Sequence, residues 1–329
     1  MQTRRSVLVA LSGAFSCALA LPGFGARAGD YPSGPIKIIV SFPAGGSIDV
    51  IMRAMAAPLQ ARLGKPIVIE NRAGAAGVVA EGAVAKADPD GLTLLADASA
   101  LAANPTLFKS MPFDTLKDLQ PVYLVFRTPL ALVVNPEVPA KSIKELIALL
   151  KEKPGQINFA HGGPGSAIHL AGELFAIMTG TTMTGVAYRG APLALNDVIA
   201  GRVALMFADA GSVTGQIKAG QVRALGVSST ERVPALPDVP TIAEAGVPGF
   251  EAVGWTLVCV PAGTPKPILD TLSAAFAAAA EAPEVHALML QLGTLPVKSP
   301  SPAELKPWLA AEIDRWGKLV ERAGVAKSL

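Results

Sequence analysis

Residues 36–49, IKIIVSFPAGGSID, are the stretch from which the fold of this chain is read. Residues 36–40 are apolar with one exception, too continuous a run for a half-exposed strand, and they predict a strand covered on both faces. Gly45 and Gly46 then break the strand, and Ser47 stands where the N-cap of a helix is expected. The stretch therefore predicts a strand, a glycine turn and the start of a helix.

A strand, a glycine turn and a helix start in this order favour the binding of an anion. Glycines lack a Cβ, so a ligand approaches the backbone closely, and the first N–H groups of the helix point at it without helical partners. We expect a carboxylate at this position. The alternative is a tight turn between strand and helix that binds nothing.

The N-terminus has the pattern of an export signal. Arg4 and Arg5 precede an uncharged run that ends in the A-x-A pattern of residues 26–28. This pattern predicts a signal peptide over residues 1–28 that is cleaved after Ala28, and a periplasmic mature protein. The other apolar runs are too short to span a bilayer, so no membrane anchor is expected.

The composition of the mature chain excludes several classes of protein. Removal of residues 1–28 leaves 25 basic and 26 acidic residues, so the net charge falls from +2 to −1. Without basic runs and interleaved aromatic residues, the chain is not expected to bind nucleic acid. Cys259 is the one remaining cysteine, which rules out an intramolecular disulfide. The 301 remaining residues suffice for one large or two ordinary domains.

Strand and helix patterns alternate twice along the chain, which predicts two α/β lobes, each a mostly parallel sheet flanked by helices. We place the first lobe at residues 29–128 and 253–329 and the second at residues 129–252. The strands expected in the first lobe are followed by loops at 41–47, 71–77 and 97–105, and ligands of such sheets bind beyond the carboxyl ends of the strands. Capping boxes predict helices after Ser142, Thr241 and Ser301. The C-terminal helices are expected to pack on the first lobe and leave a cleft.

Several motifs in their order resemble the Bug extracytoplasmic solute-binding receptors of tripartite tricarboxylate transporters. The resemblance covers the whole mature chain and rests on the number and order of the motifs rather than on any one of them. They are FPAGG at 42–46 with Asp49, ENRAGA at 70–75, PDGLTLL at 89–95, GGPGS at 162–166 with His169, YRG at 188–190, PDVPT at 237–241 and PAGTP at 261–265.

The resemblance implies a type II periplasmic-binding-protein ("Venus flytrap") fold. It also implies a monomer without a cofactor that captures a small organic acid, such as a di- or tricarboxylate, an amino acid or an aromatic acid, for the permease subunits of a tripartite tricarboxylate transporter. Carried over by position, it predicts ligand contacts from Phe42, Ala44, Gly45, Gly46, Ser47, Gly74, Ala75 and Ser99 in the first lobe, and from His161, Gly163, Gly165, Ser166, Tyr188, Gly190 and Asp209 in the second.

Individual side chains near these loops are read as follows. Asp49 is expected to orient the glycine turn, because two negative charges repel each other. His169 is expected to be a packed, hydrogen-bonded histidine, and His161, in the loop itself, a candidate donor to the ligand. Ser166 is expected to be an N-cap that also faces the cleft. Trp255 either stacks on an aromatic acid or packs at the hinge.

The sequence was also compared with the requirements of a hydrolase and of a metal site. Ser166, Asp209 and a histidine are the residue types of a hydrolase triad, but the chain has no G-x-S-x-G motif. Three scattered histidines without H-E-x-x-H or paired cysteines do not form a metal site. We therefore expect a binding protein with no catalytic residues and no metal. A ligand sensor that presents its closed form to a sensor-kinase ectodomain is the remaining alternative.

Overall fold

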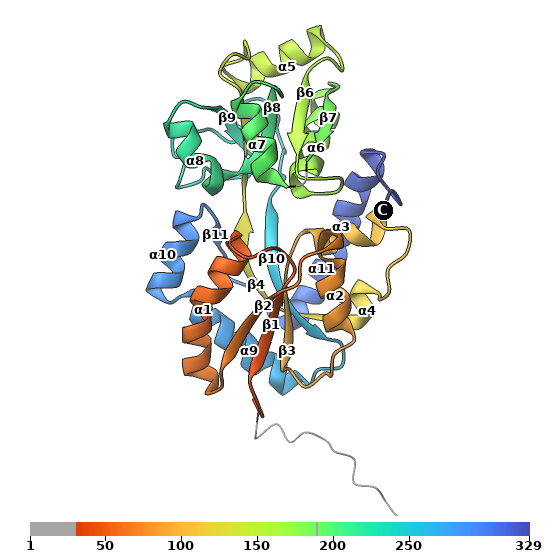
Figure 1. Cartoon of the computed structure of the whole chain (residues 1–329), viewed down its shortest axis with the longest axis vertical. Helices are drawn as coiled ribbons and strands as arrows, with labels where there is room; N and C mark the ends of the chain where they lie inside the picture. Colours follow the sequence, from red (N-terminus) through yellow and green to blue (C-terminus); the bar gives the residue numbers. More distant parts are fainter. Residues whose placement is uncertain (1–30, 189) are drawn as a thin grey trace, which may run out of the picture.

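The computed structural model describes residues 31–188 and 190–329 and consists of two lobes, one above the other in Figure 1. Each lobe is built around one β-sheet with helices packed on it, and two stretches of chain cross between the lobes. The predicted signal peptide at residues 1–28 lies outside the described residues. Within the described ranges, the helices are too short or too polar to cross a membrane.

The first lobe contains a six-stranded sheet of order β11-β4-β10-β3-β1-β2. Two parts of the chain that are distant in sequence form it, because β10 inserts between β3 and β4. Its elements are β1 (Ile36–Val40), α1 (Ser47–Leu63), β2 (Ile67–Asn71), the 3₁₀ turn η1 (Ala75–Gly77), α2 (Val78–Ala85), β3 (Thr93–Ala98), α3 (Ala100–Leu107), α4 (Thr115–Asp118), β4 (Leu119–Thr128), β10 (Gly254–Pro261), α9 (Lys266–Ala280), α10 (Pro283–Gln291), β11 (Leu295–Pro296) and α11 (Pro302–Arg322).

The second lobe contains a five-stranded sheet of order β7-β6-β8-β5-β9 and is continuous in sequence. Here β5, which arrives from the first lobe, inserts between β8 and β9 in the same way. Its elements are β5 (Leu130–Val134), α5 (Ile143–Glu152), β6 (Asn158–His161), α6 (Ala167–Thr179), β7 (Thr184–Ala187), α7 (Ala191–Ile199), β8 (Leu205–Asp209), α8 (Ala210–Lys218) and β9 (Arg223–Val227).

The predicted two-lobed α/β fold is confirmed, but both sheets are mixed rather than mostly parallel. In the first sheet β1 pairs in parallel with β2 and β3, whereas every pair that involves β10 or β4 is antiparallel. The second sheet is parallel at β7-β6-β8 and antiparallel on both sides of β5. The cause is the crossing: a strand that enters from the other lobe runs against the strands beside which it inserts.

The opening strand is covered on both faces, as its sequence predicts. Ile38 packs in an apolar layer with α1 and α9, and its neighbour Ile39 packs on the other face with α2, α3 and α11. Both side chains are fully buried or nearly so. The second lobe has one continuous core around β5, β6 and β8. At about 25 cal/mol per Å² of buried apolar surface, these layers are the main source of stability in residues 31–329, where Cys259 is a free cysteine.

Three local predictions need correction. The N-cap of α1 is Gly46, and Ser47 is already the first helical residue. Residues 97–105 are not a polar loop, because β3 continues to Ala98 and α3 follows directly. Thr241 and Glu244 exchange both hydrogen bonds of a capping box, at 2.9 and 3.0 Å, yet no helix follows them. The helices predicted after Ser142 and Ser301 are present.

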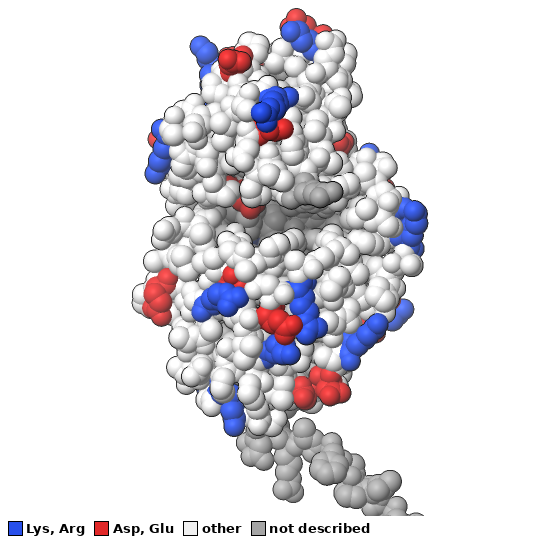
Figure 2. Space-filling view, viewed as in Figure 1, with Lys and Arg blue, Asp and Glu red and all other residues white. Residues whose placement is uncertain are grey.

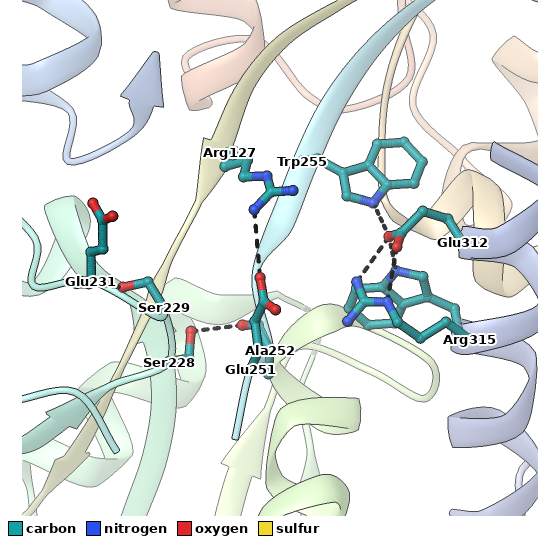
Figure 3. A network of polar contacts seen from close by, with 10 residues as sticks. Arg127, Ser228, Ser229, Glu231, Glu251, Ala252, Trp255, Glu312 and Arg315 are labelled. Carbon is teal, nitrogen blue, oxygen red and sulfur yellow. Dashed lines mark hydrogen bonds and ion pairs between the residues drawn. The ribbon is translucent and has the colours of Figure 1, made fainter. Parts of the chain in front are cut away.

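Polar contacts tie the two crossing stretches together at the hinge (Figure 3). Ser228 Oγ accepts a hydrogen bond from Leu130 N–H at 2.8 Å and donates one to the Ala252 carbonyl oxygen at 2.6 Å. Arg127 at the end of β4 pairs with Glu251 at 3.5 Å. The ion pair joins the outgoing stretch directly to the returning one, and Ser228 bridges Leu130 on the first to Ala252 on the second, so the two stretches are expected to bend together.

Candidate functional site

A cavity of about 940 Å³ lies between the two lobes, and Figure 2 shows the hollow that it makes on one face of the molecule. Small and apolar side chains make up most of its wall. From the first lobe it is lined by Phe42, Pro43, Ala44, Gly45, Gly46, Ser47, Ile48, Asp49, Ala98, Ser99, Phe126, Thr128, Gly254, Trp255, Thr256, Gln291 and Leu292, and from the second by Leu130, Ala167, Gly190, Ala191, Pro192, Leu195, Asn196, Met206, Ala208, Asp209, Gly211, Ser212 and Gln216.

Five helices begin at this cavity. The first turns or caps of α1 and α3 reach it from the first lobe, and those of α6, α7 and α8 reach it from the second. The caps of α1, α3, α7 and α8 make no side-chain hydrogen bond to the helix that follows. Their first N–H groups are therefore not occupied by a cap, and the partial positive charge of each helix start faces the same space. This arrangement is suited to bind an anion.

Backbone conformation explains why glycine precedes two of these helices. Gly45 has φ +85° and Gly190 has φ +118°, both in the range where a side chain is strained. The Gly45 N–H donates to Asp49 Oδ2 at 2.8 Å, and Arg53 Nε donates to Asp49 Oδ1 at 2.9 Å. Burial alone would raise the pKa of Asp49, but these hydrogen bonds outweigh it and lower the pKa. Asp49 thus orients the glycine turn, as predicted.

The structure brings about half of the predicted contact residues to the cavity. Those that line it are Phe42, Ala44, Gly45, Gly46, Ser47, Ser99, Gly190 and Asp209. Those that do not line it are Gly74, Ala75, His161, Gly163, Gly165, Ser166 and Tyr188. The role of both groups as ligand contacts stays a prediction.

Residues 71–77 form a turn that does not line the cavity. Gly74 has φ +149°, and Ala75 and Ala76 take left-handed backbone conformations with φ +46° and +52°. Asn104 Nδ2 donates to the Ala76 carbonyl oxygen at 3.1 Å and holds this strained turn against α3. The turn is therefore fixed to α3 rather than placed in the cavity lining.

Two neighbouring histidines, with their rings tilted by 32° to each other, hold the 162–166 loop. His161 and His169 are buried with ring centroids 4.2 Å apart. His161 Nδ1 accepts from Gly163 N–H at 3.3 Å, and His169 Nδ1 accepts from Gly165 N–H at 3.2 Å. Burial lowers the pKa of His161, and burial with the neighbouring ring lowers the pKa of His169 to about 4. Both rings are therefore neutral acceptors at pH 7, and the prediction of a packed His169 is confirmed.

Ser166 and Tyr188 are likewise engaged within the protein. Ser166 Oγ caps α6 by accepting from His169 N–H at 3.2 Å and donates to the Gly163 carbonyl oxygen at 2.8 Å. Tyr188 Oη donates to Asp197 Oδ2 at 2.8 Å. Among the described residues no hydrogen bond joins the Ser166 hydroxyl to a histidine ring nitrogen, so the three side chains of the hypothetical triad are not assembled. The described part of the chain also shows no group of three or more potential metal ligands.

Most of the polar side chains that line the cavity were not among the residues predicted from the sequence. They are Thr128, Asn196, Ser212, Gln216, Thr256 and Gln291. They lie within helices or at the hinge rather than in glycine loops, so no motif marks them. Trp255 also lines the cavity and is fixed there: its Nε1 donates to Glu312 Oε2 at 2.6 Å (Figure 3), and its ring packs edge-on against Trp308.

Comparisons with known proteins agree with this geometry. A family model described as tripartite tricarboxylate transporter family receptor matches residues 51–325. Protein BugT of Bordetella pertussis is 39% identical over 321 residues, which cover 96% of this chain and 97% of BugT. The structure of R. palustris Rpa4515 with adipate is similar at a TM-score of 0.80 and 34% identity, and covers 90% of this chain and 99% of that one. The structure of MatC from Rhodopseudomonas palustris with bound malate is similar at a TM-score of 0.75 and 33% identity. It covers 88% of this chain and 100% of that one.

Proposed function

The chain belongs to the tripartite tricarboxylate transporter receptor family, and we propose that it holds a small organic acid between its lobes and delivers it to the membrane permease of such a transporter. It is a two-lobed periplasmic carboxylate-binding receptor, as the resemblance implied. The acids named with the two similar structures, adipate and malate, are both dicarboxylates. The uncapped helix starts that meet at one cavity from both lobes carry this proposal.

The finer parts of the proposal carry over the predictions made from the sequence. The signal peptide is removed after Ala28, and the receptor acts as a monomer without catalysis. Its lobes divide at residues 128/129 and 252/253, a division supported by the hydrogen bonds and ion pair that clamp the crossings beside these points. A carboxylate of the ligand lies against residues 42–47, and a second polar group meets the starts of α7 and α8. Closure is driven by the ligand because both lobes contact it.

A thermal-shift screen of organic acids on the purified protein tests the proposed function. A ligand at 100 times its dissociation constant adds about 2.7 kcal/mol to the free energy of unfolding, which raises the melting temperature by roughly 5 °C in a protein of this size. We expect at least one di- or monocarboxylate to give such a shift, and its amide or methyl ester to give none. Turnover of the ester or amide would identify an enzyme and contradict the receptor function.

A side chain at Gly46 is expected to weaken that shift. Gly46 has φ −75°, which any residue adopts, and an added Cβ would meet only the Pro43 carbonyl oxygen, at 3.6 Å. Gly46→Val therefore folds but places two methyl groups at the start of α1, and the dissociation constant should rise at least roughly 10-fold through the loss of one charge-assisted hydrogen bond. Isothermal titration calorimetry measures it. The exposed Ala61→Val on the same helix is the matched control, and equal affinity in both variants would place the carboxylate elsewhere.

A further inference from the structure

The second-lobe wall of the cavity contains two acceptor groups in addition to its helix starts. Asp209 is the last residue of β8 and precedes α8, yet its carboxylate does not cap that helix. Gln216 lies two turns further along α8, and its Oε1 is buried without a hydrogen-bond partner among the described residues. Both side chains line the cavity. A wall that contained only N–H donors would suit a dicarboxylate. This wall also contains two hydrogen-bond acceptors, which need a donor group on the ligand.

The charges around the cavity favour a positively charged donor on the ligand. The described lining residues include two carboxylates and no lysine, arginine or histidine. Asp49 is already satisfied by Arg53 and by the Gly45 N–H. For Asp209 the structure shows no such partner in its described part, and burial raises its pKa. A carboxylate that loses water without gaining a partner is costly, and a cationic group on the ligand removes that cost.

We propose that the ligand is an amino acid, whose carboxylate meets the helix starts while its ammonium group donates to Asp209 and to Gln216 Oε1. This inference rests on the proposed function, because it concerns the acid that the same cavity takes. It narrows the ligand from any small organic acid to one that carries a protonated amine. The amine supplies several donors to two acceptors, and a hydrogen bond between two charged groups is about twice as strong as a neutral one.

Matched pairs of ligands that differ in one amino group test the inference by calorimetry. The pairs are aspartate with succinate, glutamate with glutarate, and 2-aminoadipate with adipate. We expect the amino acid of the best-fitting pair to bind at least roughly 10-fold more tightly than its partner, the worth of one charge-assisted hydrogen bond. In Asp209→Asn this preference should disappear or reverse, because the amide has lost its charge and can donate to a carboxylate. The exposed Asp314→Asn on α11 is the matched control and should keep it.

The pH dependence separates this inference from its main competitor, in which Asp209 is protonated and donates to a second carboxylate. The titratable groups among the described lining residues are Asp209 and Asp49, and hydrogen bonds hold the pKa of Asp49 low. If Asp209 binds an ammonium group, affinity for the amino acid falls as pH drops through the raised pKa of Asp209. An affinity that rises on acidification, or tighter binding of succinate, glutarate and adipate, would overturn the inference and leave the proposed function intact. Binding of no acid at all, in these pairs or in the wider thermal-shift screen, would contradict the proposed function itself.

Discussion

Gly211→Ala is expected to lower the affinity for the ligand roughly 100-fold while the lobes stay folded. Gly211, the second residue of α8, touches the chain that follows α10 in the other lobe. A Cβ on Gly211 would lie 1.8 Å from the Leu292 carbonyl oxygen and 2.6 Å from the Gly293 nitrogen. These are backbone atoms, which no rotamer change moves aside. Relief requires the lobes to separate, and overpacking of this kind costs about 1–3 kcal/mol or more.

The contact is reciprocal, which makes it specific to glycine on both sides. A Cβ on Gly293 would lie 2.3 Å from Gly211 Cα, and Gly293 has φ +68°, where a side chain is strained in any case. Gly211 and Leu292 also line the cavity. The pair therefore marks a place at the cavity where the two lobes touch, and an added methyl group should favour the open state.

Calorimetry and small-angle X-ray scattering with saturating ligand check this prediction. Gly211→Ala should keep the larger radius of gyration of an open molecule when ligand is added. Gly215→Ala lies one turn further along α8, where a Cβ has no neighbour within 4 Å, and is the matched control that should bind and close normally. Normal affinity and normal compaction in Gly211→Ala would show that the lobes close without this contact.

Glu81→Gln is expected to stabilise the protein at pH 7 by about 3 kcal/mol. Glu81 on α2 and Asp97 on β3 are fully buried side by side behind Gly77. Burial, with the charge of Asp97, raises the pKa of Glu81 to about 10, and burial raises the pKa of Asp97 to about 6. At pH 7 Glu81 therefore holds a proton that it shares with the Asp97 carboxylate, while Asn104 Nδ2 donates to Glu81 Oε1 at 2.7 Å.

The direction of the pH dependence follows from proton binding. In the unfolded chain Glu81 loses its proton above its ordinary pKa of 4.5, whereas in the folded protein it keeps the proton up to a pH of about 10. The folded state binds more protons across this window, so the free energy of unfolding falls as pH rises, by about 1.4 kcal/mol per pH unit. The stabilisation that protonated Glu81 contributes is fully present below its unfolded-state pKa of 4.5. It is lost progressively as pH rises to the folded-state pKa of about 10. Glutamine is neutral at every pH and keeps both hydrogen bonds.

Urea unfolding at pH 5, 7 and 9 measures this effect. We expect the advantage of Glu81→Gln over the natural chain to grow from pH 5 to pH 9. The exposed Glu321→Gln on α11 is the matched control and should show no advantage at any pH. A Glu81→Gln protein that is less stable than the natural chain at pH 9 would mean that the buried pair is not protonated as described.

The glycine turn and its flanking elements could be predicted because their causes are local. The run of apolar residues from Ile36 to Val40, the break at Gly45 and the apolar spacing of the next helix all lie within one short stretch. The same holds for Ser142 and Ser301, whose side chains cap helices that begin at the next residue. His169 was predicted to be packed because its helix is apolar around it, and it is.

The predictions that were wrong or missing depend on contacts between residues that are distant in sequence. Asp97 has the residue type of a polar loop, but it is buried beside Glu81, 16 residues earlier, and it pairs with Leu257 on β10, so β3 continues to Ala98. The Thr241 capping box forms both of its hydrogen bonds, yet the chain turns instead of continuing as a helix. Gln216 and Asn196 reach the cavity because of how the lobes face each other, a property that no local pattern encodes.

The insertion of β10 between β3 and β4 governs the order in which this protein can be assembled. When a ribosome has released residues 31–252, the second lobe has all five of its strands, whereas the first sheet still has a gap at its centre. The first lobe therefore cannot complete its sheet until β10 has been synthesised. A fragment of residues 129–252 is a candidate for autonomous folding, and no N-terminal fragment that ends before residue 261 can be one for the first lobe. In a nascent chain the first sheet therefore stays incomplete until residues 254–261 have been made, after the whole of the second lobe.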